Sequence, residues 1–389
     1  MKQHICLAIG LFLLGLAAFA LGLYLANSRS APTASQLPGL SGETASGFAR
    51  VQPGQTLSFP EDHGPHPDYQ TEWWYYTGNL QASSGEPRHF GYQLTFFRRA
   101  LVPAAARVSR VSAWATDQVY LAHFALADVK AQRYRAFERF ARGAVNLAGA
   151  QSEPYRVWLE DWSAQQAADG STRLQARHGD IAIDLRLTDI KGPVLQGLDG
   201  YSQKGPDPGN ASMYYSLTRL VTSGTVTTDE GTWQVDGLGW MDHEFSTSAL
   251  SPEEVGWDWF ALQLTDQTEL MVFHIRKADG SIDPFSSGTF IAPDGQPTRL
   301  SRDDFALSVT DTWRSPRSGA VYPSGWTLEA PSLDLSLRIR PYLRDQELNV
   351  SYTYWEGAVR IEGERAGQPV QGNGYVELTG YAASMQRQF

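Results

Sequence analysis

The sequence predicts a nearly all-β protein whose antiparallel strands form a sandwich or a barrel. Beyond residue 48, apolar side chains recur at every second position in several stretches, which is the pattern of strands with one buried face. Turn-forming dipeptides separate these stretches, and no long amphipathic helix is evident. The chain also contains 12 Trp, 17 Tyr and 17 Phe, and aromatic residues favour strands.

The predicted strands follow one another along the chain. The alternating stretches are residues 90–96, 120–126, 181–187, 333–339 and 348–354. Ser-Gly or Asp-Gly pairs that favour hairpin turns lie at 84–85, 169–170, 279–280 and 294–295. Residues 136–150 lack the regular spacing and predict a short helical or irregular piece instead.

Length and charge narrow the classes of protein. The 389 residues suffice for two globular domains with additional segments, at ~100–200 residues per domain. Lys and Arg total 32 against 42 Asp and Glu, so the net charge is −10, and the basic stripe of a nucleic-acid binder is missing. We therefore expect no nucleic-acid partner.

Residues 1–26 are expected to be a signal peptide or a membrane anchor. Residues 5–26 carry no charge and can cross a hydrocarbon core of ~30 Å. In both alternatives Lys2 stays on the cytoplasmic side, so we expect an exported, periplasmic protein that is held at the inner membrane if the segment is not cleaved. Residues 27–47 are rich in Ser, Ala, Pro, Thr and Gly and predict a flexible linker.

A first candidate site is Glu-Trp-Trp-Tyr-Tyr at residues 72–76. In a strand, Glu72, Trp74 and Tyr76 share one face. If that face is buried, the pKa of the carboxyl rises and the group can donate a proton near neutral pH. The alternative is a rim or solvent-exposed face on which Glu72 pairs with an arginine at 98–99.

A second candidate site is Gly-Trp-Met-Asp-His-Glu-Phe at residues 239–245. Strand geometry places Trp240, Asp242 and Glu244 on one face and His243 on the other, so these groups cannot share one metal ion unless the strand ends here. Two carboxyls two residues apart repel each other, which raises one pKa and favours acid–base chemistry. The structural alternative is a bulge or turn held by side-chain hydrogen bonds.

The third candidate, Asp258, lies between Trp257 and Trp259. Asp258 shares its face with apolar Phe260, so if buried it must be paired, protonated or functional. This run echoes the acid beside paired tryptophans about 185 residues earlier, which favours two similar β units in tandem. Chance is the alternative, because tryptophan is abundant in the chain.

Other signatures of catalysis or cofactor binding are missing from the sequence. There is no Gly-x-Ser-x-Gly elbow, no His-Glu-x-x-His zinc motif and no glycine-rich nucleotide loop. The single cysteine, Cys6, excludes a disulfide framework and a cysteine-based zinc site. We expect no metal and no cofactor.

Together these motifs resemble the AttH-like and carotenoid 1,2-hydratase (CrtC) family. The similarity runs in order from residue 48 to the C-terminus, and the Trp-Met-Asp-His-Glu-Phe form with the exported start is closer to the AttH-like branch. The segments that carry it are 68–80, 92–98, 122–125, 214–216, 239–245 and 256–260.

The resemblance implies two lipocalin-like antiparallel β-barrels in tandem. The N-terminal lipocalin-like domain would cover residues 48–245, and the C-terminal one residues 246–389. The family includes carotenoid hydratases and many secreted proteins described as hydrolases. The resemblance also implies a hydrophobic ligand and, for AttH-like members, an ABC transporter permease as partner.

If the protein is an enzyme, we expect acid-catalysed hydration of an isoprenoid or lipid ligand in an aromatic cavity. Protonating an alkene requires a desolvated carboxylic acid, and aromatic faces stabilise the resulting cation. The catalytic candidates are Asp242, Asp258 and Glu72, with His243 orienting an acid or a water. The candidates for ligand binding are Trp73, Trp74, Tyr76, Trp240, Trp257, Trp259 and His123.

Two alternatives require no hydration. The protein is then either a non-catalytic periplasmic carrier that hands a hydrophobic molecule to or from an ABC transporter, or a hydrolase that uses a carboxylate pair on an ester or glycoside. In the carrier the same cavity serves and the acids are structural.

Overall fold

The computed structural model describes residues 46–247 and 250–386. The predicted signal peptide or anchor (1–26) and all but the last two residues of the linker (27–47) lie outside these described residues. Within the described part, no helix has both the length and the apolar character needed to cross a bilayer. The helical segments there are short 3₁₀ turns: Glu61–His63 (η2), Ala104–Ala106 (η3), Arg302–Asp304 (η4) and Pro331–Leu333 (η5).

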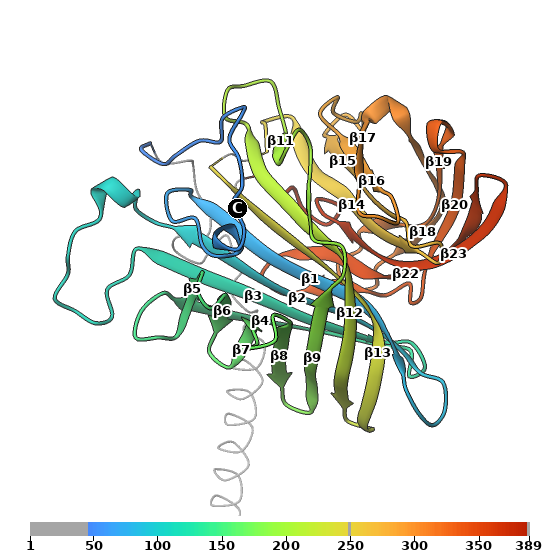
Figure 1. Cartoon of the computed structure of the whole chain (residues 1–389), viewed down its shortest axis with the longest axis horizontal. Coiled ribbons are helices and arrows are strands. Elements are labelled where there is room, and N and C mark those ends of the chain that lie inside the picture. Colours follow the sequence, from blue (N-terminus) through green and yellow to red (C-terminus); the bar gives the residue numbers. More distant parts are fainter. Residues whose placement is uncertain (1–45, 248–249, 387–389) are drawn as a thin grey trace, which may run out of the picture.

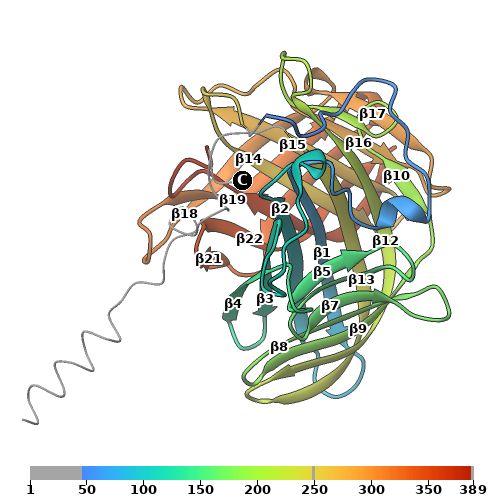
Figure 2. The same cartoon turned by 90° about the vertical axis from the view of Figure 1, so that its left-hand side faces the viewer.

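The predicted all-β architecture is confirmed, as two curled antiparallel sheets that follow one another along the chain (Figure 1). The first sheet has the order β4-β3-β2-β1-β13-β12-β9-β8-β7-β6-β5, and β10 and β11 pair with β12. Strands β3 and β4 also contact β6, so the sheet curls into a nearly closed barrel (Figure 2). Its strands are β1 (Thr71–Ala82), β2 (His89–Ala100), β3 (Gln118–Asp128), β4 (Arg133–Arg142), β5 (Ala148–Gln151), β6 (Arg156–Leu159), β7 (Trp162–Gln166), β8 (Thr172–His178), β9 (Ile181–Asp189), β10 (Pro193–Leu195), β11 (Tyr201–Gln203), β12 (Ala211–Thr228) and β13 (Gly231–Ser246).

The second sheet has the order β17-β16-β15-β14-β23-β22-β20-β19-β18, and β21 pairs with β22. It curls into a half-barrel beside the first (Figures 1 and 2). Its strands are β14 (Glu254–Leu264), β15 (Glu269–Lys277), β16 (Ser287–Ile291), β17 (Pro297–Ser301), β18 (Ala306–Arg314), β19 (Val321–Ala330), β20 (Leu335–Pro341), β21 (Glu347–Asn349), β22 (Thr353–Arg365) and β23 (Gln368–Leu378).

Each sheet encloses its own apolar core because its strands turn alternate side chains inward. Trp74, Tyr76 and Trp162 are buried in the first barrel. Trp326 and Trp355 are buried in the half-barrel of the second sheet, which we call the second barrel. Residues 136–150 are not helical: most of them belong to β4 and β5. The prediction there was wrong because β4 is an edge strand, whose residues are mostly half-exposed and need no strict alternation.

A third apolar cluster joins the two sheets. It combines outward-facing residues of the first barrel, such as Tyr75 and Trp240, with Trp259, Phe273 and Tyr375 of the second. The central strands β1 and β13 therefore have two buried faces, one toward their own barrel and one toward the neighbouring sheet. This explains why so many polar residues of these strands are buried as well.

Candidate functional site

A cavity of about 170 Å³ lies between the two sheets, and we call it the inter-sheet cavity. Its wall is mainly aromatic, with four carboxyl groups and one lysine among the lining residues. The aromatic residues are Trp73, Tyr75, Phe97, Tyr214, Trp257, Trp259, Phe273 and Tyr354, and the charged ones are Lys204, Asp242, Glu244, Glu254 and Glu377.

Strand alternation places these side chains as predicted. On β1, Thr71, Trp73 and Tyr75 face the inter-sheet cavity. On β13, which pairs with β1, Asp242 and Glu244 face it too. Neighbouring residues on both strands turn instead into the first barrel. The motifs at 72–76 and 239–245 lie on paired strands, and each contributes both to the cavity and to the interior of the first barrel.

Asp242 is the central polar group of the cavity. Its carboxyl accepts hydrogen bonds from Tyr214 Oη (2.7 Å), Trp240 Nε1 (2.7 Å) and Ser216 Oγ. Burial nevertheless raises the pKa of Asp242 to about 7, and the charge of Glu244 adds to the rise. The acid can therefore hold or release a proton near neutral pH.

A second buried acid, Glu377 on β23, lines the same cavity. Burial raises its pKa to about 8, and the nearby negative charges of Asp242 and Glu244 contribute. Its cross-strand neighbour Glu356 on β22 is completely buried, and burial together with Glu377 raises the pKa of Glu356 well above its ordinary value. Burial therefore favours the protonated form of both acids.

This pair of acids was not among the predicted site residues. Trp355-Glu356 carries the same acid-beside-tryptophan pattern that singled out Asp258, so a signal was present for Glu356. Glu377 stands in a regularly alternating strand between Tyr375 and the end of β23, with no distinguishing neighbour. Only the pairing of β22 with β23 brings the two carboxyls together.

Glu244 and Lys204 form an ion pair in the cavity wall. Lys204 Nζ lies 3.2 Å from Glu244 Oε1, and Ser212 Oγ also donates to that oxygen. The ammonium lies 4.4 Å from the ring centre of Phe273, which is within range of a cation–π contact. The ammonium of Lys204 therefore lies in the cavity wall and balances the negative charge of Glu244.

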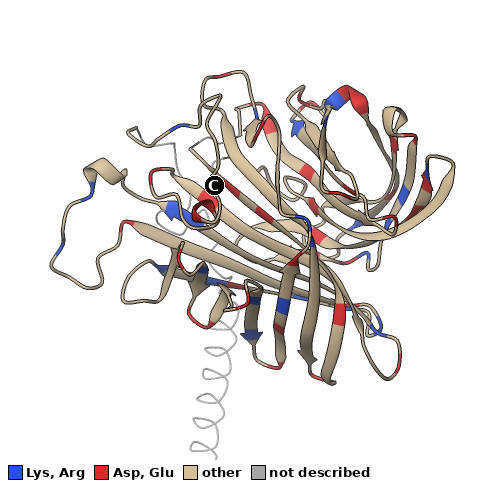
Figure 3. Cartoon of the chain, viewed as in Figure 1, with Lys and Arg blue, Asp and Glu red and all other residues tan. Residues whose placement is uncertain are grey.

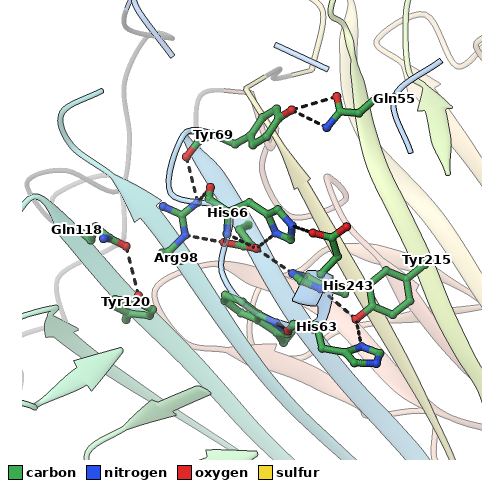
Figure 4. A network of polar contacts seen from close by, with 12 residues as sticks. Gln55, His63, His66, Tyr69, Arg98, Gln118, Tyr120, Tyr215 and His243 are labelled. Carbon is green, nitrogen blue, oxygen red and sulfur yellow. Dashed lines mark hydrogen bonds and ion pairs between the residues drawn. The ribbon is translucent and has the colours of Figure 1, made fainter. Parts of the chain in front are cut away.

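Glu72 lies on the other face of β1 and joins the polar network of the first barrel through His243. Figure 4 shows His66, Arg98 and His243 of this network. Its Oε1 is 2.7 Å from His66 Nδ1 and 2.9 Å from His243 Nε2, and its Oε2 accepts a 2.7 Å hydrogen bond from Arg98 Nε. Burial alone would raise the pKa of Glu72, but Arg98 and the two histidines outweigh it and hold the pKa well below the ordinary value.

The expectation that Glu72 donates protons was therefore wrong in its physical basis. The carboxyl is buried, but the arginine pairing that we had assigned to an exposed face occurs inside the barrel. His66 bridges Glu72 and Asp62; burial disfavours its charge, yet these two hydrogen bonds raise its pKa to about 9. His243 contacts Glu72 and not Asp242, so it does not orient the acid of the cavity.

His66, Glu72 and His243 are also the described residues that could share a metal ion. Their ligand atoms lie within 4.8 Å of one another. In this structure the two imidazoles bind the carboxylate itself, and Arg98 already neutralises its charge. The trio thus forms a hydrogen-bonded network rather than an array of free ligands. His66 was not among the predicted site residues.

Asp258 lies neither in the inter-sheet cavity nor inside the first barrel. Its side chain points into the second barrel, where Arg276 Nε lies 2.8 Å from Oδ1 and Tyr381 Oη donates to Oδ2 at 3.0 Å. Burial raises its pKa, while Arg276 opposes the rise. Asp258 does not line the inter-sheet cavity, so of the two candidate aspartates only Asp242 faces it.

The predicted ligand-binding residues divide in the same way. Trp73, Trp257 and Trp259 line the inter-sheet cavity, and Trp240 donates to Asp242. Trp74 and Tyr76 belong to the first barrel's core instead. His123 is buried between Tyr354 Oη (2.7 Å) and Glu138 (3.1 Å), at the edge of the contact between the sheets.

Comparison with known proteins gives the same fold. The crystal structure of an AttH-type protein from Nitrosomonas europaea is 36% identical, with a TM-score of 0.76 over 86% of this chain and 99% of that one. Kievitone hydratase from Nectria haematococca superposes with a TM-score of 0.63 at 16% identity, covering 89% of this chain and 98% of its own.

A curated relative is also detected by sequence. Dehydratase asqC from Emericella nidulans is 22% identical over 217 residues, which cover 53% of this chain and 60% of that protein. The AttH-like family model matches residues 50–381, which include both sheets and the inter-sheet cavity. The chain therefore belongs to the AttH-like family.

Proposed function

We propose that this protein is an enzyme that adds water to, or removes water from, a carbon–carbon bond of an apolar ligand in the inter-sheet cavity. The observation that carries the proposal is Asp242, a buried acid whose pKa is raised to about 7, within a wall of tryptophans. A general acid works best when its pKa lies near the working pH. The names of two relatives, a hydratase and a dehydratase, support this class of reaction.

The chemistry follows from the groups that face the cavity. The carboxylic acid of Asp242 gives its proton to one alkene carbon, and the π electrons form the new C–H bond. The indoles of Trp73, Trp257 and Trp259 face the cation that develops on the other carbon. A water oxygen adds to that carbon, and its surplus proton returns to the Asp242 carboxylate. Dehydration is the reverse sequence.

The size of the cavity limits the ligand. Its volume of about 170 Å³ is close to that of an engineered protein cavity of ~150 Å³ that holds one benzene molecule. A ring or a short branched segment fits, whereas a complete carotenoid-length polyene does not. The proposed substrate therefore places one ring-sized part, carrying the reacting bond, between the two sheets.

We further propose that the protein is exported to the periplasm and works beside an ABC transporter permease. The uncharged residues 5–26 behind Lys2 support export. An alkaline phosphatase fusion after residue 47 tests the proposed export, since the reporter folds to an active form only in an oxidising compartment.

The decisive experiment follows water into the product. Small molecules that co-purify with the natively expressed full chain are extracted, incubated with the protein in ¹⁸O-labelled water and analysed by mass spectrometry. We expect a product that is heavier by one labelled water if the enzyme hydrates, or lighter by one water if it dehydrates. This product should be lost in Asp242→Asn and retained in the matched control Asp258→Asn. A ligand that binds but stays unchanged with the wild type would contradict the enzyme and favour the carrier.

A further inference from the structure

The loop that joins β2 to β3, residues 101–117, exposes a group of large apolar side chains. Val111 is fully exposed, Val108 and Trp114 are 66% and 57% exposed, and Leu101 at the start of the loop is 37% exposed. Trp114 is fixed at its backbone, where its carbonyl accepts a hydrogen bond from Arg142. Solvated loops rarely present several such residues together.

This concentration is not matched elsewhere on the described surface. Eleven large hydrophobic residues are exposed among the described residues, and four of them lie in this one loop. The others occur singly or in pairs on separate strands and turns, for example Val221 in β12 and Val309 in β18. A single exposed valine needs no explanation, but a valine–valine–tryptophan group in one loop points to a partner.

The loop has a net positive charge, with two arginines and one acid, which favours an anionic partner. Arg107 and Arg110 alternate with the exposed valines, and the only acid in the loop is Asp117, the last residue before β3. Figure 3 shows basic positions in blue along this loop, at the left of the view. Arg110 Nη2 lies 2.8 Å from Asp117, and Arg107 is tied by hydrogen bonds to the backbone of Pro67 and Val102. Tryptophan, aliphatic tips and arginines side by side are typical of segments that enter the interface of an anionic bilayer.

The described chain begins directly beside this loop. Gly47 lies so close to Pro103 that a Cβ at position 47 would approach the proline ring to 3.2 Å. The uncharged residues 5–26 precede this point in the sequence. The first described residues and the apolar loop therefore lie on the same side of the molecule.

We propose that the 101–117 loop docks onto an anionic lipid bilayer, with Val108, Val111 and Trp114 entering the headgroup region. The loop follows the end of β2 that pairs with Thr71, and Thr71 lines the inter-sheet cavity. Docking thus brings this end of the cavity to the membrane, where an apolar ligand resides. This last consequence rests on the proposed function, whereas the docking itself does not.

The test uses the full chain in nanodiscs that contain phosphatidylglycerol. Cys6→Ser removes the native thiol, and Val111→Cys provides one site for an environment-sensitive NBD label. The matched control places the label at Val309→Cys, an exposed valine in β18 on the second sheet, away from the loop (Figure 1). We expect headgroup-attached quenchers to reduce the fluorescence at 111 at least about threefold more than at 309. Equal quenching at the two positions would overturn the proposal.

A second measurement separates docking from a general effect of the N-terminal segment. Adding Val108→Glu and Trp114→Glu to the protein labelled at 111 leaves residues 1–45 intact. Both positions are exposed, so the fold is expected to survive, as near-UV circular dichroism will show. The quenching at 111 is expected to fall to the level at 309. Unchanged quenching in the folded double variant would equally overturn the proposal.

Discussion

The inter-sheet cavity and the interior of the first barrel both contain an acid from the same pair of neighbouring strands, yet they treat it in opposite ways. Asp242 and Glu72 are both buried, and both accept several hydrogen bonds. The pKa of Asp242 is raised to about 7, whereas that of Glu72 is held well below its ordinary value. The strands, the burial and the number of hydrogen bonds do not explain the difference.

The charge of the hydrogen-bond donors explains it. Asp242 faces two hydroxyl groups and an indole, which are neutral, and a second carboxyl nearby. Glu72 faces the guanidinium of Arg98 and the raised-pKa imidazole of His66. Neutral donors do not offset the desolvation of an anion, but a buried cation does. The cavity therefore keeps an acid that can exchange protons, and the barrel keeps a fixed ion pair.

The largest expected effect concerns that ion pair. Arg98→Met removes the guanidinium from the buried Glu72 carboxylate and leaves the His66 imidazole as its remaining cationic partner. Breaking a buried pair in this way costs about 3–5 kcal/mol. Urea denaturation of the variant should show a loss of this size. The control, Arg173→Met, removes the exposed pair with Asp184 and should cost about 1 kcal/mol or less. Equal losses in both variants would contradict the assignment of Glu72 as a buried ion.

The second prediction concerns the pH dependence of stability. Because the folded-state pKa of Asp242 is about 7 and its ordinary value is 3.8, the native state binds more protons between these pH values. The free energy of unfolding therefore falls as the pH rises through this window, by at most about 4 kcal/mol from this residue. Asp242→Asn should flatten the dependence in denaturation curves recorded from pH 4 to 7.

Its control is Asp184→Asn. Asp184 is paired with Arg173, which lowers its pKa, so its contribution to stability is lost only at lower pH as the carboxylate becomes protonated. This variant should keep the wild-type slope between pH 5 and 7. If Asp242→Asn also kept that slope, the raised pKa of Asp242 would be refuted.

A smaller effect is expected from Glu377→Gln. The negative charge of Glu377 develops above its pKa of about 8, and the charge of Asp242 contributes to that pKa. The titrations of Glu377 and Asp242 are therefore linked. Replacing Glu377 removes this coupling, so the alkaline limb of the activity profile should become a single titration set by Asp242. The pH dependence of kcat/KM measures it. The wild-type profile should show two steps on its alkaline side. If the Glu377→Gln profile kept both steps, Glu377 would not be one of the two titrating groups.

The smallest effect is expected from Tyr214→Phe, which removes one neutral donor to Asp242. The loss of this hydrogen bond should cost about 0.5–1.5 kcal/mol of stability and raise the pKa of Asp242 further, because the anion loses a stabilising partner. Activity should therefore persist to higher pH than in the wild type. A downward shift of the activity profile would show that Tyr214 stabilises the neutral acid instead.

Much of this arrangement could be predicted from the sequence. The period-two pattern assigned Glu72 and Trp74 to one face of β1 and Trp73 to the other, and it separated Asp242 from His243 on β13. These assignments hold because side chains alternate along any strand, whatever lies on either side. Whether the acids beside tryptophans are buried stayed open in the sequence, and the structure shows that Glu72, Asp242 and Asp258 all are.

What each face meets was decided only by the tertiary structure. Pairing of β22 with β23 set Glu356 beside Glu377, and the turn before β1 returned His66 to Glu72. The same packing sent Asp258 into the second barrel against Arg276. A carboxyl's pKa depends on charges within a few ångströms, and those charges come from residues distant in sequence. The chain's local pattern therefore determined which side chains share one face of a strand, and the folded contacts determined which of them are buried and can exchange a proton.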